Sequence, residues 1–120
     1  MNAEIDALKT RLIEGMTSYK DACLQNGDDP GYSDKEISTC QSIVYNFLKA
    51  LSVVPHGNVG AVTSAVKGTV LALNDLNEKS GFSLIETDQR EDLAMLIIKA
   101  AEAVGVGNGS DDLTEAWREW

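Results

Sequence analysis

The chain has 120 residues, and its 19 acidic and 10 basic side chains give a formal net charge of −9. A chain of this length fits a single domain, which can bury a hydrophobic core without metals or disulfides. The negative charge repels the phosphates of nucleic acids and of anionic lipids. We therefore expect neither nucleic acid nor a membrane as a partner.

The sequence carries no signal for export or membrane insertion. No apolar run followed by a small-residue cleavage site occurs in the N-terminal sequence MNAEIDALKTRLIEG, so we expect no signal peptide. The most apolar stretch, residues 53–73, is interrupted by Pro55 and Lys67, which is unsuitable for a membrane span. We expect a cytoplasmic protein, in which Cys23 and Cys40 remain reduced and fill apolar faces.

Apolar residues spaced three or four apart predict a first helix over residues 3–26. Gly15 lies in the apolar face and should allow a neighbouring helix to approach closely. The turn-rich sequence NGDDPGY follows and predicts a short connection. The predicted buried face consists of Ile5, Leu8, Leu12, Met16, Tyr19 and Cys23.

A second helix is predicted over residues 33–51. Ser33 and Glu36 have the spacing of a capping box, which satisfies free amides at a helix N-terminus. Pro55 disfavours helix at the preceding residue, so the helix should end before it. The predicted buried face consists of Ile37, Cys40, Val44, Phe47, Leu48 and Leu51.

A third helix is predicted over residues 59–79, with Asn58 as its N-cap and Gly81 as its stop. Its apolar arc covers nearly half of the circumference, because three alanines widen it. This helix should therefore touch neighbours on two sides. The arc consists of Val59, Val62, Val66, Thr69, Val70, Leu73 and Leu76, widened by Ala61, Ala65 and Ala72.

The strongest helical pattern covers residues 88–104. Asp88 and Glu91 have the spacing of an N-terminal cap, and Gly105 marks the stop. The preceding Leu84 and Ile85 should tuck into one end of the core. The predicted buried face consists of Leu93, Leu96, Ile97, Ala100, Ala101 and Val104.

The last predicted element is a short helix over residues 111–118, with Ser110 as its cap. Four long amphipathic helices joined by short connections predict an all-α fold. We expect residues 1–120 to form one domain, a four-helix bundle-like core with a short C-terminal helical segment.

The candidate partner-binding residues lie around the start of the fourth helix. Acidic side chains crowd this point, and an apolar pair lies opposite the buried face. We expect a basic protein partner, because exposed charges steer association. The alternatives for the apolar pair are a homodimer seam or a cover formed by Trp117 of the tail, with Trp120 partly exposed. The candidate residues are Glu86, Asp88, Glu91, Asp92, Met95 and Ile98.

We identify no catalytic, cofactor-binding or metal-binding residues in the sequence. His56 is the single histidine and has no nucleophile or ligand motif around it. A calcium loop starting at Asp75 would place Lys79 at a ligand position, which excludes it. The expected function is a non-enzymatic protein-binding module, such as a regulator, inhibitor or immunity-type protein. The alternatives are an enzyme that uses carboxylates or His56, and an acidic DNA mimic.

Overall fold

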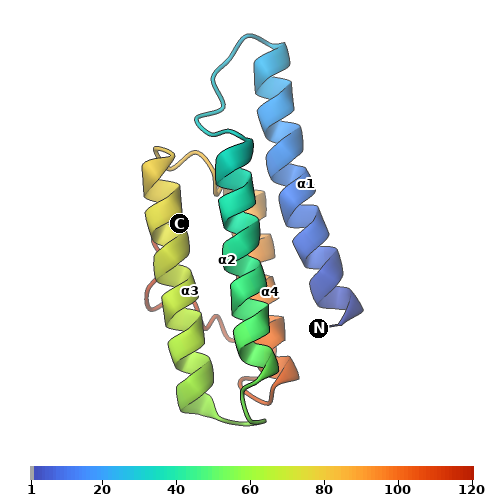
Figure 1. Cartoon of the computed structure of the whole chain (residues 1–120), viewed down its shortest axis with the longest axis vertical. Coiled ribbons are helices and arrows are strands. Elements are labelled where there is room, and N and C mark those ends of the chain that lie inside the picture. Colours follow the sequence, from blue (N-terminus) through green and yellow to red (C-terminus); the bar gives the residue numbers. More distant parts are fainter. Residues whose placement is uncertain (1) are drawn as a thin grey trace.

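The computed structural model describes residues 2–120 and confirms the all-α fold (Figure 1). Four helices make 67% of the chain helical, and no strand occurs among the described residues. They are α1 (Ala3–Gln25), α2 (Asp34–Ser52), α3 (Val59–Lys79) and α4 (Thr87–Ala103). The predicted helix boundaries agree with these within two residues. Among residues 2–120, no helix is long and apolar enough to cross a membrane.

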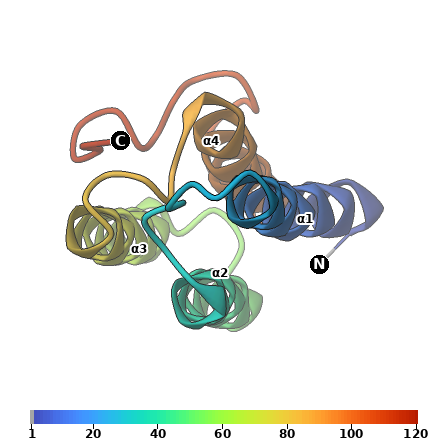
Figure 2. The ribbon, with the colours of Figure 1, turned by 90° about the horizontal axis from the view of Figure 1, so that it is seen from above.

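The helices pack in two main pairs. α1 packs chiefly against α4, and α2 packs chiefly against α3, while α1 also contacts α2. Seen from the end, the helices occupy four corners, and the C-terminal tail passes over the side between α4 and α3 (Figure 2). The tail therefore takes part in closing that side of the bundle.

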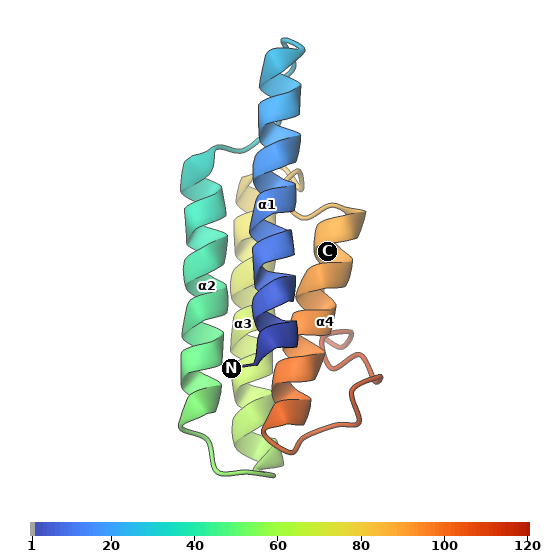
Figure 3. The ribbon, with the colours of Figure 1, turned by 90° about the vertical axis from the view of Figure 1, so that its right-hand side faces the viewer.

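The core contains most of the predicted apolar faces. Two members of these faces are exposed, Val59 at the start of α3 (60%) and Tyr19 of α1 (48%), and Cys23 of α1 is half-buried. The C-terminal end of α1 extends beyond the other helices, so the bundle does not cover it (Figure 3). Tyr19 instead stacks on Tyr32 of the following loop, with ring centroids 6.4 Å apart. The Tyr32 hydroxyl donates to the Met16 carbonyl at 2.8 Å, which fixes this loop to α1.

Two of the three N-terminal caps agree with the prediction. Ser33 and Glu36 form the capping box of α2, and Asn58 Oδ1 accepts from the Ala61 N–H at 3.1 Å at the start of α3. The predicted cap of α4 is wrong. Glu86 precedes its first residue and makes no side-chain cap hydrogen bond. Asp88 already lies in the first turn, where its negative charge interacts favourably with the positive end of the helix dipole.

Both predicted glycine stops are confirmed. After α3, the Gly81 N–H donates to the Glu78 carbonyl at 3.0 Å, and the Phe82 N–H donates to the Asn77 carbonyl at 2.7 Å. This pair of bonds is the Schellman motif, which needs a left-handed residue after the helix. Gly81 has φ 65°. Equivalent bonds follow α4 at Gly105.

The loop between α3 and α4 depends on Asn77, which is buried. Its Oδ1 accepts from the Ile85 N–H at 3.0 Å. This bond draws the loop inward, so that Leu84 and Ile85 are buried as predicted. A polar side chain in the core therefore satisfies a backbone amide that the loop would otherwise leave without a partner.

The segment predicted as a short C-terminal helix forms hydrogen-bonded turns over residues 113–117. A single helical turn is closed by the Arg118 N–H, which donates to the Thr114 carbonyl at 3.0 Å. The cap is Asp112, whose Oδ1 accepts from the Thr114 N–H at 2.9 Å. The predicted cap, Ser110, is held elsewhere, because its N–H donates to Asn108 Oδ1 at 2.9 Å.

Candidate functional site

The acidic residues at the start of α4 fall into two groups. Glu86, Asp88 and Glu91 are exposed. Asp92 is different, since only 7% of its surface is exposed. The four side chains were predicted to act together toward a partner, but they have different surroundings.

Asp92 is paired with Arg11 of α1. The Nε and Nη2 atoms of Arg11 both donate to Asp92 Oδ1, at 2.9 and 2.6 Å. The hydrogen bond to Asp92, together with its negative charge, raises the pKa of the Arg11 guanidinium above its ordinary value. Asp92 is therefore engaged in an ion pair between α1 and α4, and its charge is already neutralised within the chain.

A shallow hollow of about 380 Å³ lies between α1 and α4 beside this ion pair. Gly15 forms part of its wall, and a Cβ atom at this position would lie 3.0 Å from the Gln89 Nε2 atom. The atom that approaches Gly15 is thus the end of the Gln89 side chain, and no backbone atom of α4 lies within 4 Å of the Cβ position. The exposed carboxylates of Asp88 and Glu91 line the same hollow. The hollow brings three of the four predicted acids to one surface, and Asp92 is the one of the three that is paired.

The apolar pair on α4 does not form one patch. Met95 is 39% exposed, whereas Ile98 is 6% exposed. The prediction that both are left uncovered by the four helices holds for Met95 alone. Met95 is therefore the exposed apolar residue on α4, one helical turn from Glu91.

The C-terminal tail folds back on the bundle, as predicted, and both tryptophans pack against the core. Trp117 lines an apolar hollow of about 170 Å³ together with Val62 and Val66 of α3. The predicted position of Trp117 over Met95 is wrong, since the tail is attached to α3. Trp120 is partly exposed, as expected.

The residue that attaches the tail is Asn74 of α3, which the sequence analysis did not single out. Its Nδ2 donates to the Trp117 carbonyl at 2.8 Å, and its Oδ1 accepts from the Glu119 N–H at 3.0 Å. Asn74 is buried by this contact. The sequence does place Asn74 next to the apolar arc of α3. An asparagine in that position needs a hydrogen-bond partner if another segment buries it.

His56 lies in the loop between α2 and α3 and is exposed. The His56 ring lies against Gly105, directly after α4. A Cβ atom built at Gly105 would be 2.6 Å from His56 Nε2. The Gly57 N–H donates to the Val104 carbonyl at 2.7 Å and holds the loop there. Glu102 is the one acid of α4 near this end, and the acids at the start of the helix, Asp88 and Glu91, lie about 20–24 Å away at 1.5 Å per residue. His56 and these acids therefore belong to separate surfaces.

The two cysteines are free and have different surroundings. Cys40 is fully buried in α2, and burial raises the pKa of its thiol to about 12. Cys23 is half-buried near the end of α1. Within residues 2–120, no group of three or more His, Cys, Asp or Glu side chains is arranged to hold a metal ion.

Comparisons with protein-family models, with curated proteins and with solved structures find no match to this chain.

Proposed function

We propose that this chain is a non-enzymatic binding module for a basic protein, which it contacts through the acidic start of α4. One observation carries the proposal: Glu86, Asp88 and Glu91 are exposed there, and none of them forms an ion pair with another residue in the range 2–120. Their charges are thus available to a partner.

The electrostatics of the chain support this proposal. The net charge of −9 creates a field that attracts a basic surface and accelerates its association. Arg11 lies beside the acids, but its charge is balanced by Asp92. Met95 adds an exposed apolar contact next to the acids. A patch that combines apolar and charged groups is typical of surfaces that bind proteins.

A small domain with such a patch fits a regulator, an inhibitor or an immunity-type protein in the cytoplasm. Such a protein would act by covering a basic surface of its partner. Separation of His56 from Asp88 and Glu91 speaks against an enzyme that combines these carboxylates with the imidazole.

The test uses charge reversal with a matched control. The first variant carries Glu86→Lys, Asp88→Lys and Glu91→Lys. The control carries Asp111→Lys, Glu115→Lys and Glu119→Lys, three exposed acids of the C-terminal tail. Each protein is immobilised and used to capture proteins from the native host, and the captured proteins are identified by mass spectrometry.

We expect a basic protein that the wild type and the control retain and the first variant loses. Its association rate with the wild type should fall about tenfold or more from low to high salt, since exposed charges are screened over ~10 Å at 0.1 M. A specific partner that binds both variants equally, at a rate independent of salt, would contradict the proposal.

A further inference from the structure

A long groove runs over the outer side of the α2–α3 pair, away from the acids of α4. Two adjoining hollows of about 260 and 580 Å³ form it, and both are lined by Ile43 and Ala72. The groove extends along α2 from Lys35 to Ala50, which is about 23 Å at 1.5 Å per residue. This length would accept about four turns of a helix.

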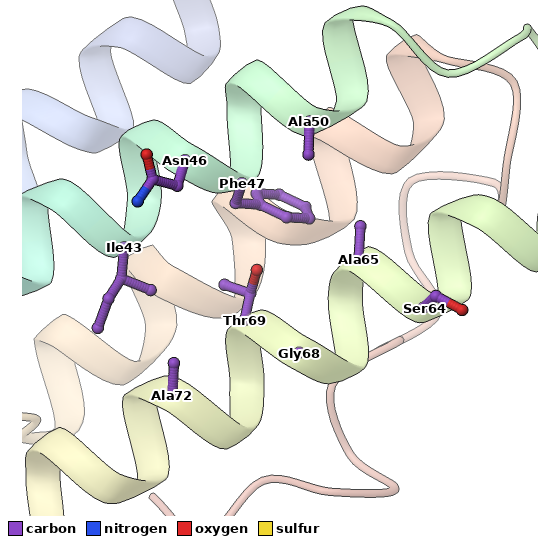
Figure 4. A pocket seen from close by; sticks show the side chains of 9 residues that line it. All are labelled: Ile43, Asn46, Phe47, Ala50, Ser64, Ala65, Gly68, Thr69 and Ala72. Carbon is purple, nitrogen blue, oxygen red and sulfur yellow. The ribbon is translucent and has the colours of Figure 1, made fainter.

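Small residues form one end of the groove. Figure 4 shows Ala65, Gly68 and Ala72 along α3, facing Ala50 and Phe47 of α2. A Cβ atom added at Gly68 would meet nothing within 4 Å, so the space above this residue is open. Small side chains allow the backbone of a second helix to come close, and ridges of such a helix fit between the two rows.

A protruding residue lies beside this depression. Leu71 of α3 is 46% exposed and is three residues from Gly68, so both lie on the same outer side of the helix. A surface with a protruding side chain beside a depression can pack against a second copy of itself. Two copies related by a twofold axis would each place Leu71 against the small residues of the other.

The distribution of charge favours a second copy of this chain as the occupant of the groove. Residues 34–79, which contain α2 and α3, hold four acids and four bases, so this half of the bundle is neutral. The whole charge of −9 therefore belongs to α1, α4, the other loops and the tail. Two copies that meet through α1 or α4 bring like charges together, which opposes association. Two copies that meet through α2 and α3 keep their acidic sides apart.

We propose that the α2–α3 groove is a self-association surface, whose occupant is the α2–α3 face of a second copy of this chain. The proposed basic partner binds the acidic start of α4, whereas a second copy of the chain binds the α2–α3 groove. The dimer would present two acidic sides to solvent, one from each copy.

The test is analytical ultracentrifugation of the purified chain across a range of concentrations, with two glutamate variants. Gly68→Glu places a carboxylate over the groove, in the space proposed for Leu71 of the other copy. Gly60→Glu is the matched control: it lies in the same helix, is exposed, and its Cβ has one ordinary contact, 3.8 Å from Asn58 Oδ1. Circular dichroism verifies that both variants remain helical.

We expect wild type and Gly60→Glu to reach twice the 12.9 kDa mass of one chain as concentration rises. The Gly68→Glu variant should remain a monomer over the same range, and Leu71→Ser should raise the dissociation constant at least tenfold. Added salt should not weaken the dimer, since screening reduces repulsion between the acidic sides.

Two results would overturn this proposal. One is a wild-type chain that remains a monomer up to about 500 µM, a concentration near the weak end of specific association. The other is a dimer that Gly68→Glu leaves unchanged, which would place the contact on another face. Both measurements use the purified chain alone, so they are independent of whether a basic partner is found.

Discussion

The side chain of Asn74 holds the backbone of Trp117, with Nδ2 donating to the Trp117 carbonyl at 2.8 Å. The same amide accepts from the Glu119 N–H at 3.0 Å, so it binds the tail through both of its functional groups. The tail has little regular structure of its own. This side chain of α3 therefore supplies polar contacts that hold the tail over the bundle, beside the packing of its tryptophans.

Asn74→Ala should release the tail, because it removes both hydrogen bonds and leaves the backbone groups of the tail without partners. We expect a loss of about 1–3 kcal/mol in the free energy of unfolding and a red shift of the tryptophan emission. Gln41→Ala, at an exposed position of α2, is the control and should change neither quantity. Emission that stays the same in Asn74→Ala would mean that other contacts hold the tail.

Leu96→Ala and Ile97→Ala should each destabilise the protein by about 2–5 kcal/mol, since both remove atoms from a packed core and leave a cavity. Both side chains are buried in α4. Met95→Ala in the same helix is the control, and its effect should be much smaller because Met95 is exposed. Urea unfolding monitored by circular dichroism provides the measurement. Equal effects at the three positions would show that the assigned buried face is wrong.

Alkaline pH should destabilise the fold through two buried groups. Burial raises the pKa of Tyr32 to about 12 from 10.0, and that of the Cys40 thiol to about 12 from 9.0. The unfolded chain loses both protons at lower pH than the folded chain does. Their contribution is therefore fully present below about pH 9 and is lost as the pH rises to about 12.

The urea midpoint measured from pH 8 to pH 11 checks this expectation. Cys40→Ala should reduce the slope of the midpoint against pH, because it removes one of the two groups. Val44→Ala, which truncates a buried side chain of the same helix that carries no titrating proton, is the control and should preserve the slope. A wild-type midpoint that is constant over this range would contradict the assigned linkage.

Gly105→Ala should destabilise the protein by about 1–3 kcal/mol, because a residue with a Cβ is strained in the left-handed region. Gly105 has φ 87°, and the added Cβ would also press on His56. Gly60→Ala is the control and should stabilise the protein by about 0.5–1 kcal/mol through helix propensity. Thermal melting of both variants tests the contrast. A stable Gly105→Ala variant would mean that the His56 loop moves away without cost.

Local sequence patterns were sufficient for the fold. Apolar spacing located all four helices, because each buries one face along most of its length. Ser33, Asn58 and Gly81 marked helix ends correctly, since their partners lie within a few residues. Tyr19 was misjudged because periodicity does not reveal where a helix extends beyond its neighbours.

The candidate surface was less predictable, because its decisive contacts join distant parts of the chain. Asp92 is buried by its pairing with Arg11, 81 residues away. Asn74 is buried by the tail, and 43 residues separate it from Trp117. No pattern within one helix distinguishes such residues from solvated ones. Sequence reasoning could place Asp92 on α4, but the geometry of α1 was needed to find its partner.

The pairing of α1 with α4 has a consequence for the order of folding. α2 and α3 are joined by a short loop, so their contacts close at little entropic cost and can form early. α1 is synthesised first, but its main partner is the last of the four helices. Until α4 has been made, the apolar stripe of α1 has no stable cover. The newly made chain is thus exposed to aggregation through its first helix, and slower synthesis of residues 26–86 would lengthen that interval.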